Sequence, residues 1–241
     1  MILLPPFNIS PLGDSALLLD FGNAIDENLN ELVVSVFHQL RKHPLPGMVE
    51  AVPAYSSIAV YYQPGMVRRQ GNDQITAFES MSQAIRKLLE KGRGHQPKEG
   101  KLVTIPVCYD YDFAPDLKWI VRRNKISENE IIRIHASATY RVFMIGFLPG
   151  FPYMGVLDER IAAPRKASPV MVEEGSVGIA GNQTGIYPFQ SPGGWQIIGR
   201  TPLRLFDVSV KNNPALLQTG DLVQFTSITR DEFENIKSRH S

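Results

Sequence analysis

The sequence predicts two domains of different fold class, an α+β domain followed by a mainly β domain. Before about residue 95, two amphipathic helical patterns alternate with short strands, as in a small α+β sandwich of the ferredoxin-like kind. From Tyr140 to Phe225, short β-branched and aromatic runs are separated by turn residues, as in a β-barrel or compact sandwich. Between these regions, residues 91–101 are polar and rich in glycine. We therefore expect an α+β domain at 1–93, a linker at 94–101 and a β-barrel domain at 102–241.

The elements of the first domain follow from apolar spacing and from capping residues. Apolar residues between Leu29 and Leu40 recur at i, i+3, i+4, i+7, i+8 and i+11, which places them on one helix face. Asp26 is a suitable N-cap for this helix, and His43-Pro44 ends it. We expect strands at 12–21, 49–53 and 57–62, helices at 26–42 and 73–91, and a turn at 63–65.

The second domain is predicted to begin with a strand and two short helices. Pro106 interrupts the strand, because proline lacks a backbone donor. Asp116 is placed to cap the first helix, and Ser127 with Glu130 forms an S-x-x-E capping box for the second. We expect the strand at 102–107, the helices at 116–124 and 127–136, short strands between 140 and 225, and a helical turn at 231–237.

The composition excludes several classes of partner. Of the 241 residues, 43% are hydrophobic and 20% charged, and the net charge of +1 lacks the basic excess of a nucleic-acid binder. The longest apolar runs are too short to span a bilayer, and the N-terminal MILLPPFNIS has no basic residue, unlike a secretory signal. The single cysteine, Cys108, excludes an internal disulfide and fits a reducing cytosol. We expect a cytoplasmic protein with no nucleic-acid or membrane partner.

One segment, residues 146–202, stands out for its glycine and proline content. It holds ten of the chain's 19 glycines and seven of its 18 prolines within 57 residues. Glycine allows positive φ and close approach of another molecule, and proline stiffens turns. A flexible linker would be poor in Ile, Phe, Tyr and Trp, all of which are abundant here. The segment is therefore predicted to be a rigid, shaped surface made of turns.

Polar and aromatic side chains in this segment are candidates for a binding site. Arginine presents a planar fork that matches carboxylate or phosphate, so Arg165 with Lys166 and Arg200 with Thr201 are the best anion-binding candidates. The alternative is that Arg165 and Lys166 are solvated and that Arg200 pairs with Asp207. The other candidate binding residues are Gly181, Gln183, Thr184, Tyr187, Ser191, Gly193, Gly194 and Trp195.

Other reactive residue types have weaker patterns. The five histidines show no metal-ligand spacing, so no metal site is predicted. His135 lies at a predicted helix end, where it either serves the helix C-terminus through its charge or takes part in ligand binding or proton transfer. Cys108 has no neighbouring activator and is interpreted as a core residue. Ser15 is the serine of a GDS-like box, Gly13-Asp14-Ser15, but no late Asp-x-x-His supplies a base, and no P-loop or Rossmann fingerprint occurs.

Longer motifs resemble a known family. GFLPGFPYMG (146–155), APRKASPV (163–170) and GSVGIAGNQTGIYPFQSPGGWQIIGRTPL (175–203) are similar to the family of 5-oxoprolinase B subunits, Kip-type sporulation-kinase inhibitors and allophanate hydrolase subunit 1. The likeness extends through PVCYDYDFAPDL (106–117), HASATYRVFMIGF (135–147), LLQTGDLVQF (216–225) and LGDSALLLDFG (12–22), so it covers nearly the whole chain. Glu173 and Glu174 depart from the neutral residues that the family usually has before Gly175.

The resemblance implies both a fold and an activity. The second domain would be a cyclophilin-like barrel, and the chain would act with a paralogous C subunit of related fold and a separate A subunit. Together the three proteins would couple ATP hydrolysis, with Mg²⁺, to opening of the 5-oxoproline lactam, which yields glutamate. ATP is implied for the complex and not as a group tightly bound to this chain. Relatives that act on urea-derived amides leave the substrate open.

Within this framework, residue chemistry suggests catalytic roles for His135 and Arg200. Arg200 or Arg165 would pair with the substrate carboxylate or a phosphate. Backbone amides of Gly181–Gly185 and Gly193–Trp195 would stabilise an oxyanion or phosphoryl oxygens. His135 would assist proton transfer or orient the substrate. We expect Arg200→Ala to lower ATP-dependent hydrolysis by the complex of three subunits by orders of magnitude.

Two other functions are compatible with the sequence. The resemblance also implies a regulator without chemistry that binds the dimerisation helices of a sensor histidine kinase. Phe151, Tyr153 and Trp195 would anchor such a partner on an exposed apolar patch, while Phe147 is expected in the core. The third interpretation is an isolated module that binds a small acid. A homodimer through the α+β domain is compatible with its amphipathic elements.

Overall fold

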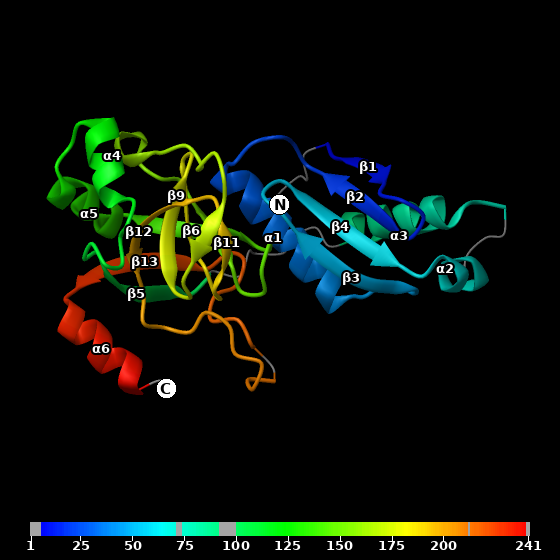
Figure 1. Cartoon of the computed structure of the whole chain (residues 1–241). Helices are drawn as coiled ribbons and strands as arrows, with labels where there is room; N and C mark the ends of the chain where they lie inside the picture. The colour runs from blue at the N-terminus through cyan, green and yellow to red at the C-terminus, as the bar shows by residue number, and fades with distance from the viewer. Residues whose placement is uncertain (1–5, 71–73, 92–99, 212, 240–241) are drawn as a thin grey trace. The chain divides into compact units, whose positions relative to one another are not determined.

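The computed structural model describes residues 6–70, 74–91, 100–211 and 213–239. The chain divides into two compact units, 1–99 and 100–241 (Figure 1). Residues 94–99 of the predicted linker at 94–101 lie outside the described residues. In the part of the chain that is described, no helix combines the length and apolar character needed to cross a membrane.

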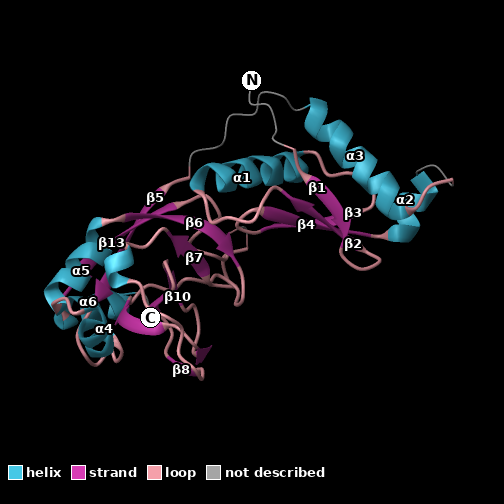
Figure 2. Cartoon of the chain, turned by 90° about the horizontal axis from the view of Figure 1, so that it is seen from above, coloured by secondary structure: helices cyan, strands magenta, loops and turns pink. Residues whose placement is uncertain are grey.

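The first unit is a two-layer α+β sandwich. Its antiparallel sheet has the strand order β1-β2-β4-β3, and Figure 2 shows helices α1 and α3 on the same side of it. The core lies between the layers, where Leu17, Leu19 and Ile58 of the sheet meet Val33 and Leu40 of α1. The elements are β1 (Asn8–Pro11), β2 (Ala16–Asp20), α1 (Glu27–Lys42), β3 (Met48–Pro53), β4 (Ser57–Tyr62), α2 (Pro64–Gln70) and α3 (Ala77–Lys91).

Helix α1 forms as the sequence predicts. The Asp26 side chain accepts a hydrogen bond of 2.9 Å from the backbone N–H of Leu29, so it satisfies one of the free donors of the first turn. His43 is the C-cap, immediately before Pro44. Of the predicted apolar face, Val33, Val36 and Leu40 are buried, and the other three residues pack partly buried against the same core; Asn30, Val34 and Gln39, which lie outside that face, are buried as well. Capping and periodicity agree here, and the predicted helix is confirmed.

Three features of this unit differ from the sequence prediction. The predicted strand at 12–21 begins later, at Ala16, because Gly13 has a φ of 71° and lies in the turn that joins β1 to β2 in a hairpin. Strand β1 lies at the sheet edge, beside β2. In a β-α-β-β-α-β sandwich this edge position belongs to the last strand, which follows the second helix. The predicted turn at 63–65 leads into α2. The second helix begins at Ala77, where Thr76 and Glu79 form a reciprocal capping box, and the predicted start at Asp73 lies outside the described residues.

The second unit is built around a closed seven-stranded barrel, which confirms the predicted fold class of an α+β domain plus a mainly β barrel. The barrel order is β10-β7-β6-β13-β5-β12-β9, closed by pairing of β9 with β10. Strands β5 and β13 are parallel and the other pairs antiparallel. The barrel strands are β5 (Leu102–Cys108), β6 (Thr139–Ile145), β7 (Pro152–Gly155), β9 (Ser176–Ala180), β10 (Gln183–Ile186), β12 (Gln196–Arg200) and β13 (Leu222–Ile228).

Outside the barrel lie a small two-stranded sheet and several helices. Helices α4 and α5 lie side by side at one end of this unit, and α5 packs against β13 (Figure 2). The Ser127 side chain caps α5, as predicted. These elements are α4 (Leu117–Asn124), α5 (Glu128–Ser137), the 3₁₀ helix η1 (Glu159–Ile161), β8 (Val170–Val172), β11 (Ser191–Gly193) and α6 (Arg230–Arg239).

Two predictions for this unit are wrong in detail. Strand β5 continues through Pro106. Strand β12 pairs with β5 only at Cys108, so the edge of β5 that faces β12 needs no backbone N–H donor at the proline. The predicted helical turn at 231–237 is the ten-residue helix α6, whose first turn is capped by Thr229 and Glu232.

Candidate functional site

The predicted site residues fall into three places in the second unit. The Gly/Pro segment supplies strands β7 to β12 and their connections, so it is part of the barrel wall as well as its surface. His135 and Thr184 lie in the barrel interior. Gln183 lies on the opposite face of β10 from Thr184, because side chains alternate along a strand, and it pairs with Ala180 of an aromatic cluster. The other residues around this cluster are Arg165, Lys166, Gly181, Tyr187, Ser191, Gly193, Gly194 and Trp195, and Arg200 and Thr201 lie at the end of β12.

His135 is enclosed by a fully connected hydrogen-bond network. Its side chain has 0% exposure, and its ring stacks on Phe225 with centroids 4.4 Å apart. Nδ1 lies 2.8 Å from the Tyr109 hydroxyl, and Nε2 lies 3.0 Å from Oγ1 of Thr184. The Thr184 hydroxyl donates to the carbonyl of Gly178. Thr184 must therefore accept from Nε2–H, and the unprotonated Nδ1 accepts from Tyr109.

This network makes His135 a neutral interior group. Burial lowers the pKa of His135 to about 3, far below its usual 6.5. A neutral ring cannot serve the C-terminus of α5 through positive charge. With no exposed surface, the imidazole has no contact with an external substrate in this conformation. His135 instead joins α5 to strands β5 and β10 through Tyr109 and Thr184.

An aromatic cluster lies where β10 ends and β12 begins. Phe151 meets Tyr187 and Trp195 edge-on, with centroids 5.0 Å and 5.4 Å away, and Tyr153 contacts Trp195 at 5.8 Å. A Cβ at Gly185 would lie 2.9 Å from both the Phe151 and the Trp195 rings. This glycine therefore makes room for aromatic packing and not for an approaching ligand.

The burial of this cluster corrects the predicted docking patch. Phe151 and Trp195 are only 1% and 5% exposed, so they cannot anchor a partner protein on a surface patch. Phe147, which we expected in the core, is 63% exposed. Its φ of 67° lies in the left-handed region, within the turn between β6 and β7. The sequence pattern cannot reveal such a turn conformation at a phenylalanine.

Lys166 is a structural residue. Its Nζ lies 2.6 Å from Oδ2 of Asp116, and both side chains are less than one-fifth exposed. The Lys166 backbone N–H also donates to the carbonyl of Gly194, and Oδ2 of Asp116 accepts from the backbone N–H of Ile197. Asp116, predicted to cap α4 with its side chain, makes no such capping bond. The ion pair instead joins the start of α4 to β12 and to the loop before β8.

Arg165, the neighbouring cation, has a different environment. Its side chain is exposed, and within the described residues it makes no hydrogen bond or ion pair. Burial raises the pKa of Tyr153 and Tyr187, and the positive charge of Arg165 partly offsets both shifts. The guanidinium therefore acts on both phenol groups. Ser191 is 8% exposed, and its buried hydroxyl has no hydrogen-bond partner among the described residues. We refer to Arg165, Tyr153 and Tyr187 as the Arg165 site.

The predicted backbone oxyanion hole is wrong for its first segment. Strand β10 is paired on both edges, with β9 and β7, so its amides face strand partners. The Gly181 N–H donates to the carbonyl of Ala163. In the second segment, a hydrogen bond from the Trp195 backbone N–H lowers the pKa of Tyr187 against the larger effect of burial. These amides have structural partners that residue identity alone does not disclose.

Arg200 lines a separate pocket. Its Nε donates to the carbonyl of Glu174 at 2.7 Å, and its Nη2 lies 3.9 Å from a carboxylate oxygen of Glu173. The proposed pairing with Asp207 is therefore wrong. The pocket has a volume of about 120 Å³. The residues that line it, which we call the Arg200 pocket, are Glu174, Arg200, Thr201, Pro202, Leu203, Arg204, Phe233 and Lys237.

Two further groups complete the inventory of reactive residues. Cys108 is fully buried, and burial raises the pKa of its thiol, so it is a core residue and not an activated nucleophile. Among the residues described by the structure, no three His, Cys, Asp or Glu side chains come together in a group suited to a metal ion.

Comparison with known proteins identifies the family. Residues 7–217 match the family model for the carboxyltransferase domain, subdomain C and D. The chain is 41% identical to the 5-oxoprolinase B subunit of Bacillus subtilis (strain 168), over 96% of this chain and 97% of that protein. It is 38% identical to the 5-oxoprolinase B subunit of Escherichia coli O157:H7, over 75% of this chain and 78% of that protein.

A solved structure supports the same assignment. The protein TTHA0988 is 32% identical to this chain and superimposes with a TM-score of 0.75. The match covers 88% of this chain but 40% of TTHA0988, so this chain corresponds to less than half of that longer polypeptide. Sequence and structure agree, and the resemblance drawn from the sequence motifs is confirmed. The chain therefore belongs to the 5-oxoprolinase B-subunit family.

Proposed function

We propose that this chain is the B subunit of an ATP-dependent 5-oxoprolinase that opens 5-oxoproline to glutamate together with the A and C subunits. The observation that carries the proposal is the 41% identity to a 5-oxoprolinase B subunit over nearly the full length of both chains. The match to only 40% of TTHA0988 supports a requirement for further protein, because that relative carries additional sequence in the same polypeptide.

The reaction explains why ATP is needed. A lactam carbonyl is a poor electrophile, and ATP with Mg²⁺ supplies a phosphoryl group that activates its oxygen. Water then attacks the carbonyl carbon and the ring C–N bond breaks, with a proton passing to the leaving nitrogen, which gives an acyl phosphate. A second water hydrolyses the acyl phosphate to the carboxylate of glutamate and inorganic phosphate. The site must hold a carboxylate-bearing ring and exclude competing water. The nucleotide acts in the assembled complex.

In this chain, Arg165 is the best candidate for holding the substrate carboxylate. Lys166 is already paired with Asp116, and Arg200 lies in the separate pocket, whereas Arg165 has no ion-pair partner in the described structure. A guanidinium can bind a carboxylate through two parallel hydrogen bonds. The partly exposed Tyr153 ring, on which the Arg165 charge acts, offers an apolar surface beside it.

His135 has a positioning role in this proposal. Its network fixes Thr184 in β10, the strand that leads from Gly181 to Tyr187. The ring is not a proton donor to substrate, because it is neutral and enclosed. Proton transfer must then come from another group, and a site shared with the C subunit would supply it.

Product stoichiometry tests this function. The chain is co-expressed with the A and C subunits, and the purified complex is incubated with 5-oxoproline and ATP. We expect glutamate, ADP and phosphate in equal amounts, with no glutamate when ATP is omitted. Glutamate without ADP, or ATP hydrolysis that opens a urea-derived amide and leaves 5-oxoproline intact, would contradict the proposal.

A further inference from the structure

We propose that Gln196 is a positioning residue that holds Arg165 in the orientation needed to receive the substrate carboxylate. The Nε2 of Gln196 donates a hydrogen bond of 3.0 Å to the backbone carbonyl of Pro164, the residue before Arg165. The bond joins strand β12 of the barrel to the exposed segment that carries the arginine. The inference rests on the proposed function for the role of Arg165, and its geometric part is measured without catalysis.

The backbone on both sides of Arg165 is held by neighbouring segments. The carbonyl of Ala163 accepts a hydrogen bond of 2.7 Å from the backbone N–H of Gly181, which lies between β9 and β10. The backbone N–H of Lys166 donates to the carbonyl of Gly194, also at 2.7 Å, between β11 and β12. Together with the glutamine bond, these contacts leave the exposed side chain of Arg165 extending from a fixed stretch of backbone.

The glutamine bond acts on the peptide plane that leads into Arg165. The carbonyl of Pro164 and the backbone nitrogen of Arg165 belong to one planar peptide unit. The proline ring already fixes φ of Pro164, so its ψ is the remaining free rotation before that plane. The hydrogen bond from Gln196 to the carbonyl restricts this rotation. It therefore sets the direction in which the chain enters Arg165.

The donor end of this bond is fixed as well. Gln196 is the first residue of β12, pairs with Ile179 of β9 and is only 5% exposed. Water therefore competes little for its amide, and a buried amide without a partner would be costly. A glutamine that only stabilised the barrel would affect stability alone. A glutamine that directs Arg165 must also affect where the guanidinium lies and how tightly the substrate binds.

Two tyrosines report where the Arg165 guanidinium lies. Its positive charge opposes the effect of burial on the pKa of Tyr153 and Tyr187, and this influence weakens with distance. Arg165→Gln should therefore raise the pKa of both phenols. Gln196→Met keeps nearly the same side-chain length but removes the donor, and should raise both pKa values by a smaller amount. Titration of the tyrosine Cζ resonances in the full chain by NMR measures these changes.

Kinetics of the complex with the A and C subunits test the consequence for the substrate. Gln196→Met should raise KM for 5-oxoproline about tenfold and change kcat less than about twofold, because the carboxylate contact is misaligned while the reacting groups are unchanged. The double variant of Gln196→Met and Arg165→Gln should have the same KM as Arg165→Gln alone. Such non-additivity is expected of a residue that acts through another.

Gln39→Met is the matched control. Gln39 in α1 is 7% exposed, and its Nε2 donates a hydrogen bond of 3.0 Å to the backbone carbonyl of Leu88 in the first unit. The control therefore removes a bond of the same kind, length and burial, and should leave KM and both tyrosine pKa values unchanged. Gln196→Asn, whose amide is one methylene shorter, takes the place of Gln196→Met if that variant does not fold, and should give the same changes.

The inference is overturned if Gln196→Met leaves both tyrosine pKa values as in the wild type, or if its effect on KM multiplies with that of Arg165→Gln. It is also overturned if Gln39→Met raises KM as much as Gln196→Met does. A wild-type complex that releases no glutamate would overturn the proposed function instead. In that case the tyrosine titration still decides whether Gln196 positions Arg165.

Discussion

The barrel interior around His135 and the surface around Arg165 both belong to the second unit, yet they differ in one respect. In the interior, His135, Thr184 and Tyr109 satisfy one another, and burial keeps the imidazole neutral. At the surface, the exposed Arg165 side chain has no ion-pair partner in the described residues. Polar groups that are already satisfied stabilise a fold, whereas unsatisfied ones are available to a ligand.

The largest expected effect comes from removing the unsatisfied cation. Arg165→Gln should lower kcat/KM for 5-oxoproline in the assembled complex about 100-fold, mainly through KM, because a charge-assisted bond to the substrate carboxylate is lost. The melting temperature should stay unchanged, since Arg165 has no partner to leave unpaired. Arg165→Lys should restore part of the activity. A variant with normal KM, or one that loses stability instead, would remove the distinction between the two regions.

The buried His135 should make the free energy of unfolding depend on pH. Because the pKa of His135 is depressed to about 3 in the folded chain and stays near 6.5 when unfolded, the unfolded state binds a proton first as pH falls. The free energy of unfolding should therefore decrease by about 1.4 kcal/mol per pH unit from this residue between pH 6.5 and 3, with no contribution above pH 6.5. His135→Gln should lack this component in urea titrations at pH 7, 6 and 5. Parallel pH dependence in both proteins would show that His135 titrates normally.

A smaller effect is expected at the ion pair between Lys166 and Asp116. Asp116→Asn retains an acceptor for the Ile197 N–H but leaves Lys166 without its counter-charge, and should cost about 2–3 kcal/mol of stability. Lys166→Met should cost a similar amount. The double variant should cost less than the sum of the two, and strict additivity in the cycle would mean that the pair does not interact.

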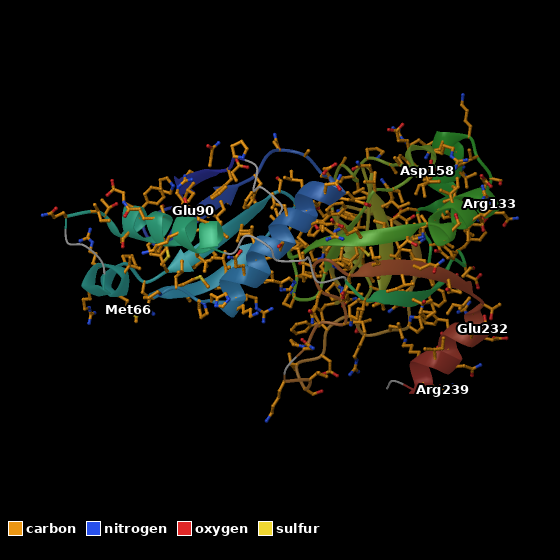
Figure 3. All side chains as sticks on the ribbon, turned by 180° about the vertical axis from the view of Figure 1, so that it is seen from behind. Met66, Glu90, Arg133, Asp158, Glu232 and Arg239 are labelled. Carbon is orange, nitrogen blue, oxygen red and sulfur yellow. The ribbon has the colours of Figure 1, made fainter. Side chains whose placement is uncertain are left out.

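The smallest effect is expected on the exposed face of α5. Arg133 and Glu130 form an exposed ion pair one turn apart on α5, and Figure 3 shows Arg133 there. Arg133→Gln should change the free energy of unfolding by less than about 0.5 kcal/mol and leave 5-oxoproline hydrolysis intact. It is the matched control for Arg165→Gln. A loss of activity in this variant would show that arginine removal is disruptive in general.

Sequence reasoning succeeded where the determinants are local. Asp26 and Ser127 cap their helices as predicted, and apolar spacing predicts the buried face of α1. It failed where backbone geometry or long-range pairing decides. The positive φ of Gly13 places the first residues of one predicted strand in a turn, and Pro106 is tolerated because β12 makes only one pairing with β5.

The same division applies to the candidate site. Arg165 and Lys166 are adjacent and chemically alike, and only the fold brings Asp116 to one of them. Arg204 and Lys237, which share a pocket with Arg200, come from segments that the Gly/Pro motif does not include. No spacing rule joins residue 204 to residue 237, because helix α6 returns to β12 only in three dimensions.

The most direct test of the account is the rate of glutamate release from 5-oxoproline by the A and C subunits, measured with and without this chain and with and without ATP. The account predicts glutamate only when ATP is present together with all three proteins, and a rate about 100-fold lower when Arg165→Gln replaces the wild-type chain. Equal glutamate release in the absence of this chain, or release that does not require ATP, would contradict it.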